Sequence, residues 1–165
     1  MAATALQIDQ TLEYPLRKTA PAARLQEKVL LIEDSEEAMF LVRCALEDCG
    51  NGRYALSWAK SLIEGLEKLS EGGIDIVLLD LGLPESSGPE SYAWVRQMAP
   101  KVPVVVLTGD PREETEFAVT ASGVEGYLIK DQLSGALLLR TIQNALSSKR
   151  RRDDHLGPFR FRLTK

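Results

Sequence analysis

Short apolar runs alternate with amphipathic segments through most of the chain, and this alternation predicts its fold. The clearest run, Val29 to Ile32, is continuously apolar and leads directly into Glu33 and Asp34. Such a run is typical of a strand that is covered on both faces, as in a parallel sheet. Ser35 then fits the N-cap of a helix, because its hydroxyl can accept a hydrogen bond from the first turn.

The same strand-then-helix pattern recurs along the chain without any sequence repeat. Strands are expected at five apolar runs: Val29–Ile32, Tyr54–Trp58, Ile74–Leu79, Val102–Leu107 and Tyr127–Ile129. A helix is expected after each of them, at about residues 35–50, 62–69, 89–98, from Pro111 onward, and 134–149. Units of this kind joined by short loops predict an α/β fold, a doubly wound parallel sheet of five strands with helices on both faces.

Polar side chains stand where four of these five strands end. They are Glu33 with Asp34, then Asp80, Thr108 and Lys130. Ligands of doubly wound sheets bind at the carboxyl ends of the strands. The topology therefore predicts a functional site made of these residues before any family is considered.

Composition and length are typical of one soluble globular domain, since the chain has 165 residues of which 44% are hydrophobic and 27% charged. Residues 28–148 carry the strand and helix pattern, so we expect them to form that domain. Residues 1–27 show no sustained period and are interpreted as an N-terminal arm, and residues 149–165 as a basic C-terminal tail. Cys44 and Cys49 lie in a helix-like apolar stretch and are interpreted as reduced thiols of the core.

The net charge of −4 hides a division between the domain and the tail. From Lys149 onward seven Lys and Arg residues face two Asp residues, whereas residues 1–148 carry 13 basic and 22 acidic groups. An acidic body disfavours nucleic acid as a partner, although the tail could meet a local anion. The apolar runs are too short to span a bilayer and the first residues lack the pattern of a signal peptide, so we expect a cytoplasmic protein with no membrane partner.

The residues at the strand ends suit phosphoryl chemistry. Gathered at one edge, Glu33, Asp34 and Asp80 would repel one another, and a hard divalent cation such as Mg2+ relieves that repulsion. Lys130 could then face one phosphoryl oxygen and the Thr108 hydroxyl another. Asp80 would be left to act as a carboxylate nucleophile toward phosphorus.

Four stretches of the sequence carry a resemblance to a known family. They are LIEDS at residues 31–35, DIVLLDLGLP at 75–84, VLTG at 106–109 and GYLIK at 126–130. Over about Lys28 to Ser148 the chain resembles the receiver domain of bacterial response regulators. The resemblance implies a flavodoxin-like sheet with the strand order 2-1-3-4-5.

The resemblance also implies what the acidic residues do. Asp80 would accept a phosphoryl group from a histidine kinase or a histidine phosphotransfer protein. Glu33, Asp34 and Asp80, together with the backbone carbonyl of Gly82, would hold Mg2+. A protein of this kind is a signalling module rather than an enzyme.

For the remaining site residues, the resemblance implies contact with the phosphoryl group and a switch. Thr108 and Lys130 would contact phosphoryl oxygens, and Tyr127 would be the aromatic switch that turns inward when Thr108 moves. The phosphorylated form would signal through protein contacts, among them a possible homodimer through the fourth helix, fifth strand and fifth helix. Trp58 and Trp94 are interpreted as packing residues or surface anchors, with no chemistry assigned to them.

Two other functions compete with the phosphorylated receiver. Asp131 stands where receivers usually have a proline after the lysine, which leaves the shape of the last loop open. The alternative is therefore a pseudo-receiver, a protein interaction module that takes up no phosphate. A phosphatase of the aspartyl-phosphate type is disfavoured, because such enzymes need a second Asp two residues after the first, and Gly82 stands there.

Overall fold

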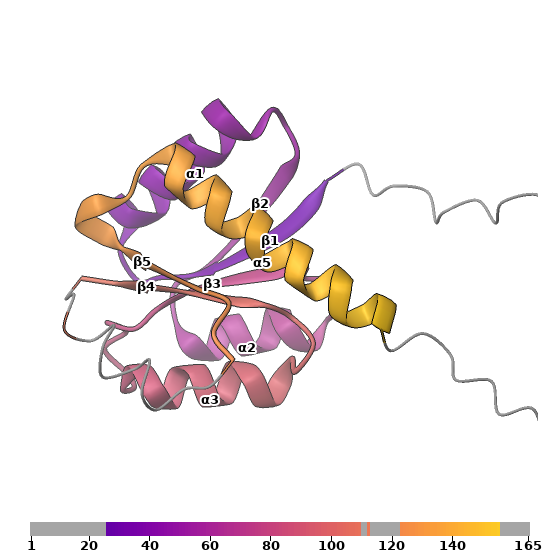
Figure 1. Cartoon of the computed structure of the whole chain (residues 1–165). Helices are drawn as coiled ribbons and strands as arrows, with labels where there is room; N and C mark the ends of the chain where they lie inside the picture. The colour runs from indigo at the N-terminus through magenta and orange to yellow at the C-terminus, as the bar shows by residue number, and fades with distance from the viewer. Residues whose placement is uncertain (1–25, 110–111, 113–122, 156–165) are drawn as a thin grey trace, which may run out of the picture.

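The computed structural model describes residues 26–109, 112 and 123–155, which form a three-layer α/β structure (Figure 1). The N-terminal arm up to residue 25, most of the helix expected from Pro111 onward and the tail from residue 156 lie outside the described residues. Within the described ranges, no helix combines the length and the apolar character needed to cross a membrane. The elements in chain order are β1 (Glu27–Ile32), α1 (Glu36–Gly50), β2 (Tyr54–Ala59), α2 (Leu62–Ser70), β3 (Ile76–Asp80), α3 (Gly88–Met98), β4 (Val104–Thr108), β5 (Gly126–Ile129), the 3-10 turn η1 (Lys130–Gln132) and α5 (Gly135–His155).

The sheet has the expected topology. Its five strands are all parallel and lie in the order β2-β1-β3-β4-β5. The doubly wound fold and its strand order are therefore confirmed. α1 and α5 cover one face of the sheet, and α2 and α3 cover the other (Figure 1). Strands β1, β3 and β4 are buried on both faces, which explains their continuous apolar runs.

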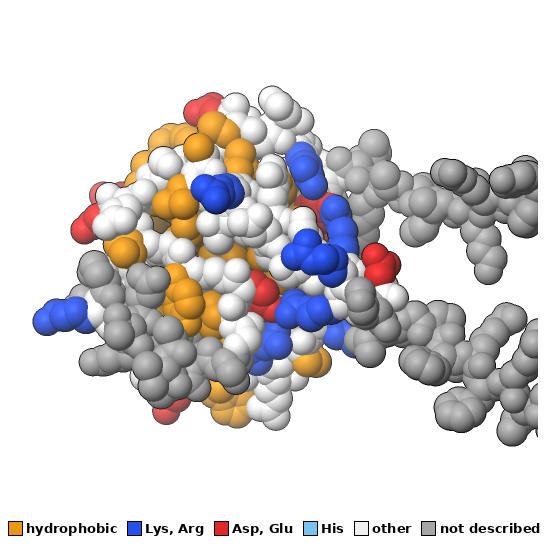
Figure 2. Space-filling model, viewed as in Figure 1, with side chains coloured by type: hydrophobic (Ala, Val, Ile, Leu, Met, Phe, Trp, Pro, Cys, Tyr) orange, Lys and Arg blue, Asp and Glu red, His pale blue; other side chains and the backbone are white. Residues whose placement is uncertain are grey.

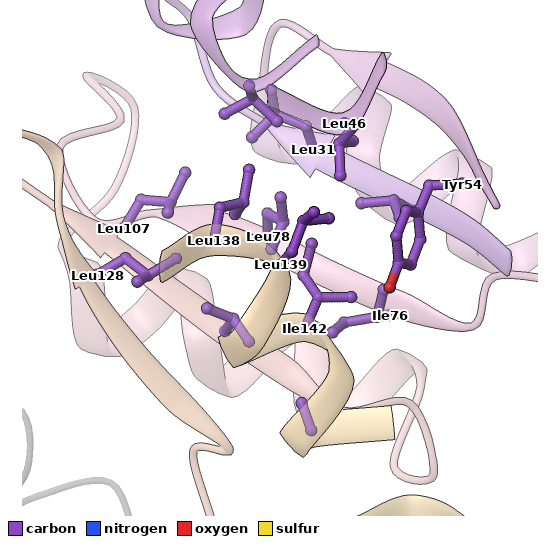
Figure 3. Packing of buried hydrophobic residues seen from close by; sticks show 14 of the residues in the cluster. Leu31, Leu46, Tyr54, Ile76, Leu78, Leu107, Leu128, Leu138, Leu139 and Ile142 are labelled. Atoms are coloured by element: carbon purple, nitrogen blue, oxygen red, sulfur yellow. The ribbon is translucent and has the colours of Figure 1, made fainter. Parts of the chain in front are cut away.

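Alternate residues of each central strand enter two separate cores. In β1, Val29 and Leu31 face α1 and α5, whereas Leu30 and Ile32 face α2 and α3. Figure 3 shows the first of these cores, where Leu138 and Ile142 of α5 lie close to Leu78 and Ile76 of β3; all four are fully buried. The strand period of two thus fixes which helix each strand residue contacts.

Helix α1 begins where the sequence predicts, but two apolar residues of the helix are exposed. Ser35 is the N-cap, and its Oγ accepts a hydrogen bond from the Ala38 amide at 3.3 Å. Leu41, which shares the helical spacing of the core residues, is 60% exposed. Cys44 and Cys49 are free thiols as expected, but Cys49 is exposed and does not belong to the core. The apolar stripe of α1 is therefore wider than the face that it buries.

Helix α2 approaches the sheet closely at a glycine. A Cβ added to Gly65 would lie 2.4 Å from Cδ1 and 2.8 Å from Cγ1 of Ile32, which is fully buried. Glycine in a helix is unfavourable by about 0.5–1 kcal/mol relative to alanine. The close approach of α2 to β1 requires this residue, because any side chain at position 65 meets a packed strand residue.

Helix α5 continues to His155, past the end expected at residue 149. Its extension is held by ion pairs to the body: Arg150 pairs with Glu27, and Arg152 Nη2 lies 2.8 Å from Glu125 Oε1. The Glu125 side chain is only 5% exposed and also accepts the Val104 amide at 2.8 Å. Lys and Arg side chains gather over this end of α5 in Figure 2. Basic residues that the sequence assigns to a tail thus belong to the last turns of a helix.

We expect Gly65→Ala to destabilise the protein, even though alanine is the better helix former. Overpacking against Ile32 costs about 1–3 kcal/mol, which exceeds the gain in helix propensity of about 1 kcal/mol. Urea denaturation measures the free energy of unfolding, and Glu67→Ala at an exposed position of the same helix is the control. A more stable Gly65→Ala protein would contradict the close approach.

Loss of the Arg152 pair is expected to lower the free energy of unfolding by about 1 kcal/mol, since Glu125 is buried and loses a charged hydrogen-bond donor. The measurement is urea denaturation of Arg152→Ala. The matched control is Arg151→Ala, whose guanidinium bonds the exposed end of the same helix at Ser148 Oγ, 3.0 Å away. Equal effects of the two substitutions would show that the extension is not held by Glu125.

Candidate functional site

The carboxyl edge of the sheet brings the predicted site residues together. Since all strands are parallel, their last residues meet at one edge, the left edge in Figure 1. Asp80 and Thr108 are the final residues of β3 and β4. Glu33 follows β1 directly, and Lys130 follows β5 as the first residue of η1.

Lys130 joins two buried carboxylates at this edge. Its Nζ lies 2.8 Å from Glu33 Oε2 and donates a hydrogen bond of 3.0 Å to Glu33 Oε1. The same ammonium lies 2.9 Å from Asp80 Oδ2. Glu33 is fully buried, and Asp80 is 2% exposed. The ammonium therefore neutralises charge that the protein interior would otherwise hold unpaired.

Backbone amides complete the environment of the two carboxylates. The Ser35 amide donates to Glu33 Oε1 at 3.2 Å, and the Gly82 amide donates to Asp80 Oδ1 at 3.1 Å. A Cβ added to Gly82 would lie 3.5 Å from both carboxylate oxygens of Asp80. A glycine at this position keeps the approach to Asp80 open, and it places the predicted carbonyl ligand in the loop that contacts Asp80.

The electrostatics of the pair show a site with too much negative charge. Burial raises the pKa of Glu33 and the charge of Asp80 raises it further, while the hydrogen bond from Lys130 lowers it. Burial lowers the pKa of Lys130, but hydrogen bonds to Glu33 and Asp80 outweigh burial and raise it above its ordinary value. Lys130 thus stays charged, and one ammonium faces more carboxylate than it can balance.

The donor set fits a hard divalent cation. Carboxylate oxygens of Glu33, Asp34 and Asp80 lie within 4.8 Å of one another, with Asp34 exposed on the solvent side. The Oε2 atom of Glu33 is buried, and the Lys130 ammonium lies 2.8 Å from it. Mg2+ takes oxygen ligands and keeps several waters, so a cluster with two buried carboxylates and one exposed carboxylate suits it.

The last two predicted residues lie on neighbouring strands. Thr108 is fully buried and pairs with Ile129 across β4 and β5. Ile129 directly precedes Lys130, so Thr108 lies opposite the residue before the lysine. Tyr127 pairs with Val106, is half-buried, and packs against the core on the α2 and α3 side. The switch role of Tyr127 stays a prediction.

The departure at Asp131 does not displace the lysine. Residues 130–132 form the turn η1, in which the Leu133 amide donates to the Lys130 carbonyl at 3.1 Å. The described residues contain no cis peptide bond. The Lys130 side chain nevertheless contacts both buried carboxylates, so a proline is not needed here to bring it into the site.

Sequence reasoning missed one residue at the site, Trp58. Its Nε1 donates a hydrogen bond of 2.7 Å to the backbone carbonyl of Glu33. Trp58 pairs with Leu31 in the register of β1 and β2, near the carboxyl ends of both strands. The signal that could have identified it is an indole near the end of a strand that neighbours the one leading into Glu33.

Comparison with known proteins gives one consistent result. The family model of the response regulator receiver domain matches residues 29–142. The KDP operon transcriptional regulatory protein KdpE of Escherichia coli is 35% identical over 112 residues, which cover 68% of this chain and 48% of KdpE. The chain spans about half the length, or less, of the curated relatives that it matches.

Solved structures show the same fold. A signal receiver domain of an HD domain-containing protein from Pseudomonas fluorescens has a TM-score of 0.72 at 23% identity, over 84% of this chain and 99% of that one. The receiver domain of the sensor histidine kinase PA1611 from Pseudomonas aeruginosa has a TM-score of 0.64 at 22% identity, over 74% of this chain and 98% of that one. That structure is described as having a magnesium ion coordinated in its active site cleft.

We expect Lys130→Met to destabilise the metal-free protein by about 3–5 kcal/mol, because it leaves two buried carboxylates unpaired. The loss should grow with pH. Without the lysine, burial and the Asp80 charge raise the Glu33 pKa against only the weaker effect of the Ser35 amide, so the folded state binds a proton that the unfolded state releases above about pH 4.5.

Urea denaturation in EDTA between about pH 5 and about pH 8 measures this dependence. The control is Lys60→Met, which removes an exposed ion pair to Glu36 and is expected to change the free energy of unfolding far less. A Lys130→Met protein whose stability does not fall more steeply with pH than that of the native protein would contradict the charge balance described above.

Proposed function

We propose that this chain, which belongs to the response regulator receiver domain family, accepts a phosphoryl group on Asp80 from a histidine kinase or a phosphotransfer protein. The observation that carries the proposal is the position of Asp80. Its carboxylate is nearly buried at the carboxyl edge of the sheet, yet it contacts a charged lysine and lies within 4.8 Å of two further carboxylates. Receiver domains act in two-component signalling, which is consistent with this arrangement.

The transfer that we propose is an in-line displacement. An Asp80 carboxylate oxygen forms a bond to phosphorus as the bond between phosphorus and the partner's histidine nitrogen breaks, and that nitrogen keeps the electron pair. The Lys130 ammonium, 2.9 Å from Asp80 Oδ2, balances charge on the transferred group. The Thr108 hydroxyl donates to another phosphoryl oxygen. The residues of the site contribute position and charge, with Asp80 alone forming a covalent bond.

Receiver domains bind Mg2+ at an acidic site, and the cluster at this sheet edge matches that property. We propose that Glu33, Asp34, Asp80 and the Gly82 carbonyl hold the ion. Bound Mg2+ would supply positive charge that one lysine cannot. The exposed position of Asp34 supports this assignment, because it leaves room for the waters that Mg2+ retains.

Signalling would then proceed by protein contacts. Receiver domains interact with histidine kinases and phosphotransfer proteins, and these are the proposed partners. A homodimer through the fourth helix, β5 and α5 is part of the proposal, although most of the fourth helix lies outside the described residues. Nucleic acid is not proposed as a partner, since Arg150 and Arg152 already pair with acidic residues of the body.

The proposed organisation is an N-terminal arm at residues 1–27, a receiver domain at 28–148 and a basic C-terminal tail at 149–165. The first turns of that tail continue α5 and contact the domain through Glu27 and Glu125. A pseudo-receiver that takes up no phosphate is the alternative function. The contact of Lys130 with Asp80 despite Asp131 favours the phosphorylated form.

Acetyl phosphate with Mg2+ is expected to add one phosphoryl group to the native protein, and Asp80→Asn is expected to abolish the addition. Intact mass spectrometry measures it, with EDTA as the metal-free condition. Asp75→Asn is the matched control, because Asp75 precedes the same strand and bonds the Lys28 amide at 2.9 Å, at the opposite edge from the site.

Beryllofluoride provides a second assay, because it mimics the phosphoryl group without requiring transfer. The native protein and Asp75→Asn should change their NMR spectra on its addition with Mg2+, and Asp80→Asn should not. Absence of change in the native protein in both assays would favour the pseudo-receiver.

A further inference from the structure

We infer that Trp58 is a positioning residue for the Mg2+ ligands, acting through the peptide group that links Glu33 to Asp34. This inference rests on the proposed function, because it concerns the same metal site. It adds a residue on the edge strand β2 to a site otherwise built from the ends of β1, β3, β4 and β5. Trp58 would act through the backbone, with no contact to the metal itself.

Residues of strand β2 form hydrogen bonds with both the backbone amide and the backbone carbonyl of Glu33. The Glu33 amide donates to the Ala59 carbonyl at 3.0 Å, which continues the ladder between β1 and β2 by one residue. The Glu33 carbonyl accepts the Trp58 indole N–H at 2.7 Å. Since β2 ends at Ala59, the indole supplies a donor where the ladder of backbone hydrogen bonds stops.

The peptide group between Glu33 and Asp34 joins two of the three carboxylates in the acidic cluster. If its carbonyl lost the hydrogen bond from the Trp58 indole, the peptide plane could rotate. Such a rotation would move both carboxylates relative to Asp80. The Glu33 side chain is further held by Lys130 and the Ser35 amide, whereas Asp34 is exposed. The indole hydrogen bond is therefore expected to matter most for Asp34.

The indole is itself fixed in place. Its ring packs partly buried against the core on the α1 and α5 side. The Lys60 ammonium lies 4.6 Å from the ring centroid and 2.7 Å from Glu36 Oε1 in the first turn of α1. Trp58 is thus held between a core, a cation and the turn that carries the metal ligands, which gives its N–H a defined direction.

The experiment uses the chain with Trp94→Phe, so that Trp58 is its only tryptophan; Trp94 is 55% exposed on α3, which covers the opposite face of the sheet from the Trp58 ring. Isothermal titration calorimetry with MgCl2 gives the affinity, and indole emission gives an independent signal. We expect Mg2+ to bind the Trp94→Phe chain as it binds the native chain. Trp58 emission should change in proportion to Mg2+ occupancy.

Two replacements of Trp58 separate positioning from packing. One is Trp58→Phe, and the other is β-(3-benzothienyl)alanine at position 58, which keeps the shape of the ring and lacks the N–H. Both are expected to weaken Mg2+ affinity about 10-fold. Removing a hydrogen-bond partner of a metal ligand typically weakens metal affinity by about 10-fold to 100-fold, and 10-fold is the lower end of that range. Circular dichroism in EDTA shows whether each chain is folded.

The outcomes distinguish this inference from the proposed function. Unchanged Mg2+ affinity in the benzothienyl chain overturns the positioning role, whatever the phenylalanine variant does. Absence of Mg2+ binding to the native chain overturns the proposed metal site and the inference together. Normal Mg2+ binding with no response of Trp58 emission also overturns the inference, while the proposed function stands.

Discussion

The excess of buried negative charge at the carboxyl edge of the sheet is the constraint on which this structure depends. Two buried carboxylates share one ammonium, and a third carboxylate stands beside them in solvent. An arrangement of this kind lowers stability unless a cation or a protonated group offsets it. Without a bound cation, the carboxylates at this edge therefore carry more negative charge than the single ammonium neutralises. Such an excess of negative charge suits a signalling protein, because a cation that binds at this edge changes the free energy of the folded state.

The sheet makes this concentration of charge possible. Its central strands are covered on both faces by helices, so the strand ends are the places where polar groups can approach one another without interrupting a core. Close packing supports the site from both sides. On one face α2 approaches β1 at Gly65, and on the other the long helix α5 covers β3 and β4. Rigid surroundings hold like charges together that would otherwise separate.

The sequence predicted the sheet and the polar residues that gather at its carboxyl edge, because both depend on local patterns. Glu33, Asp34, Asp80, Thr108 and Lys130 are recognisable as polar residues that end apolar runs, and a parallel sheet brings such residues to one edge. Trp58 was missed because its role depends on the register between β1 and β2, which apolar runs do not specify. The end of α5 was misplaced for a similar reason, since Glu27 and Glu125 are distant in sequence from the arginines that they hold.

Helix α5 has a further consequence when it is considered as a mechanical element. It begins five residues after Lys130 and continues for 21 residues, about 31 Å, to the opposite edge of the sheet. At that far end, ion pairs fasten it to the strand β1 and to the residue before β5. Between its two ends α5 also packs on the core through Leu138 and Ile142, so it is held along its length and not at a single point. One continuous helix thus links the loop that carries Lys130 to the amino edge of the sheet.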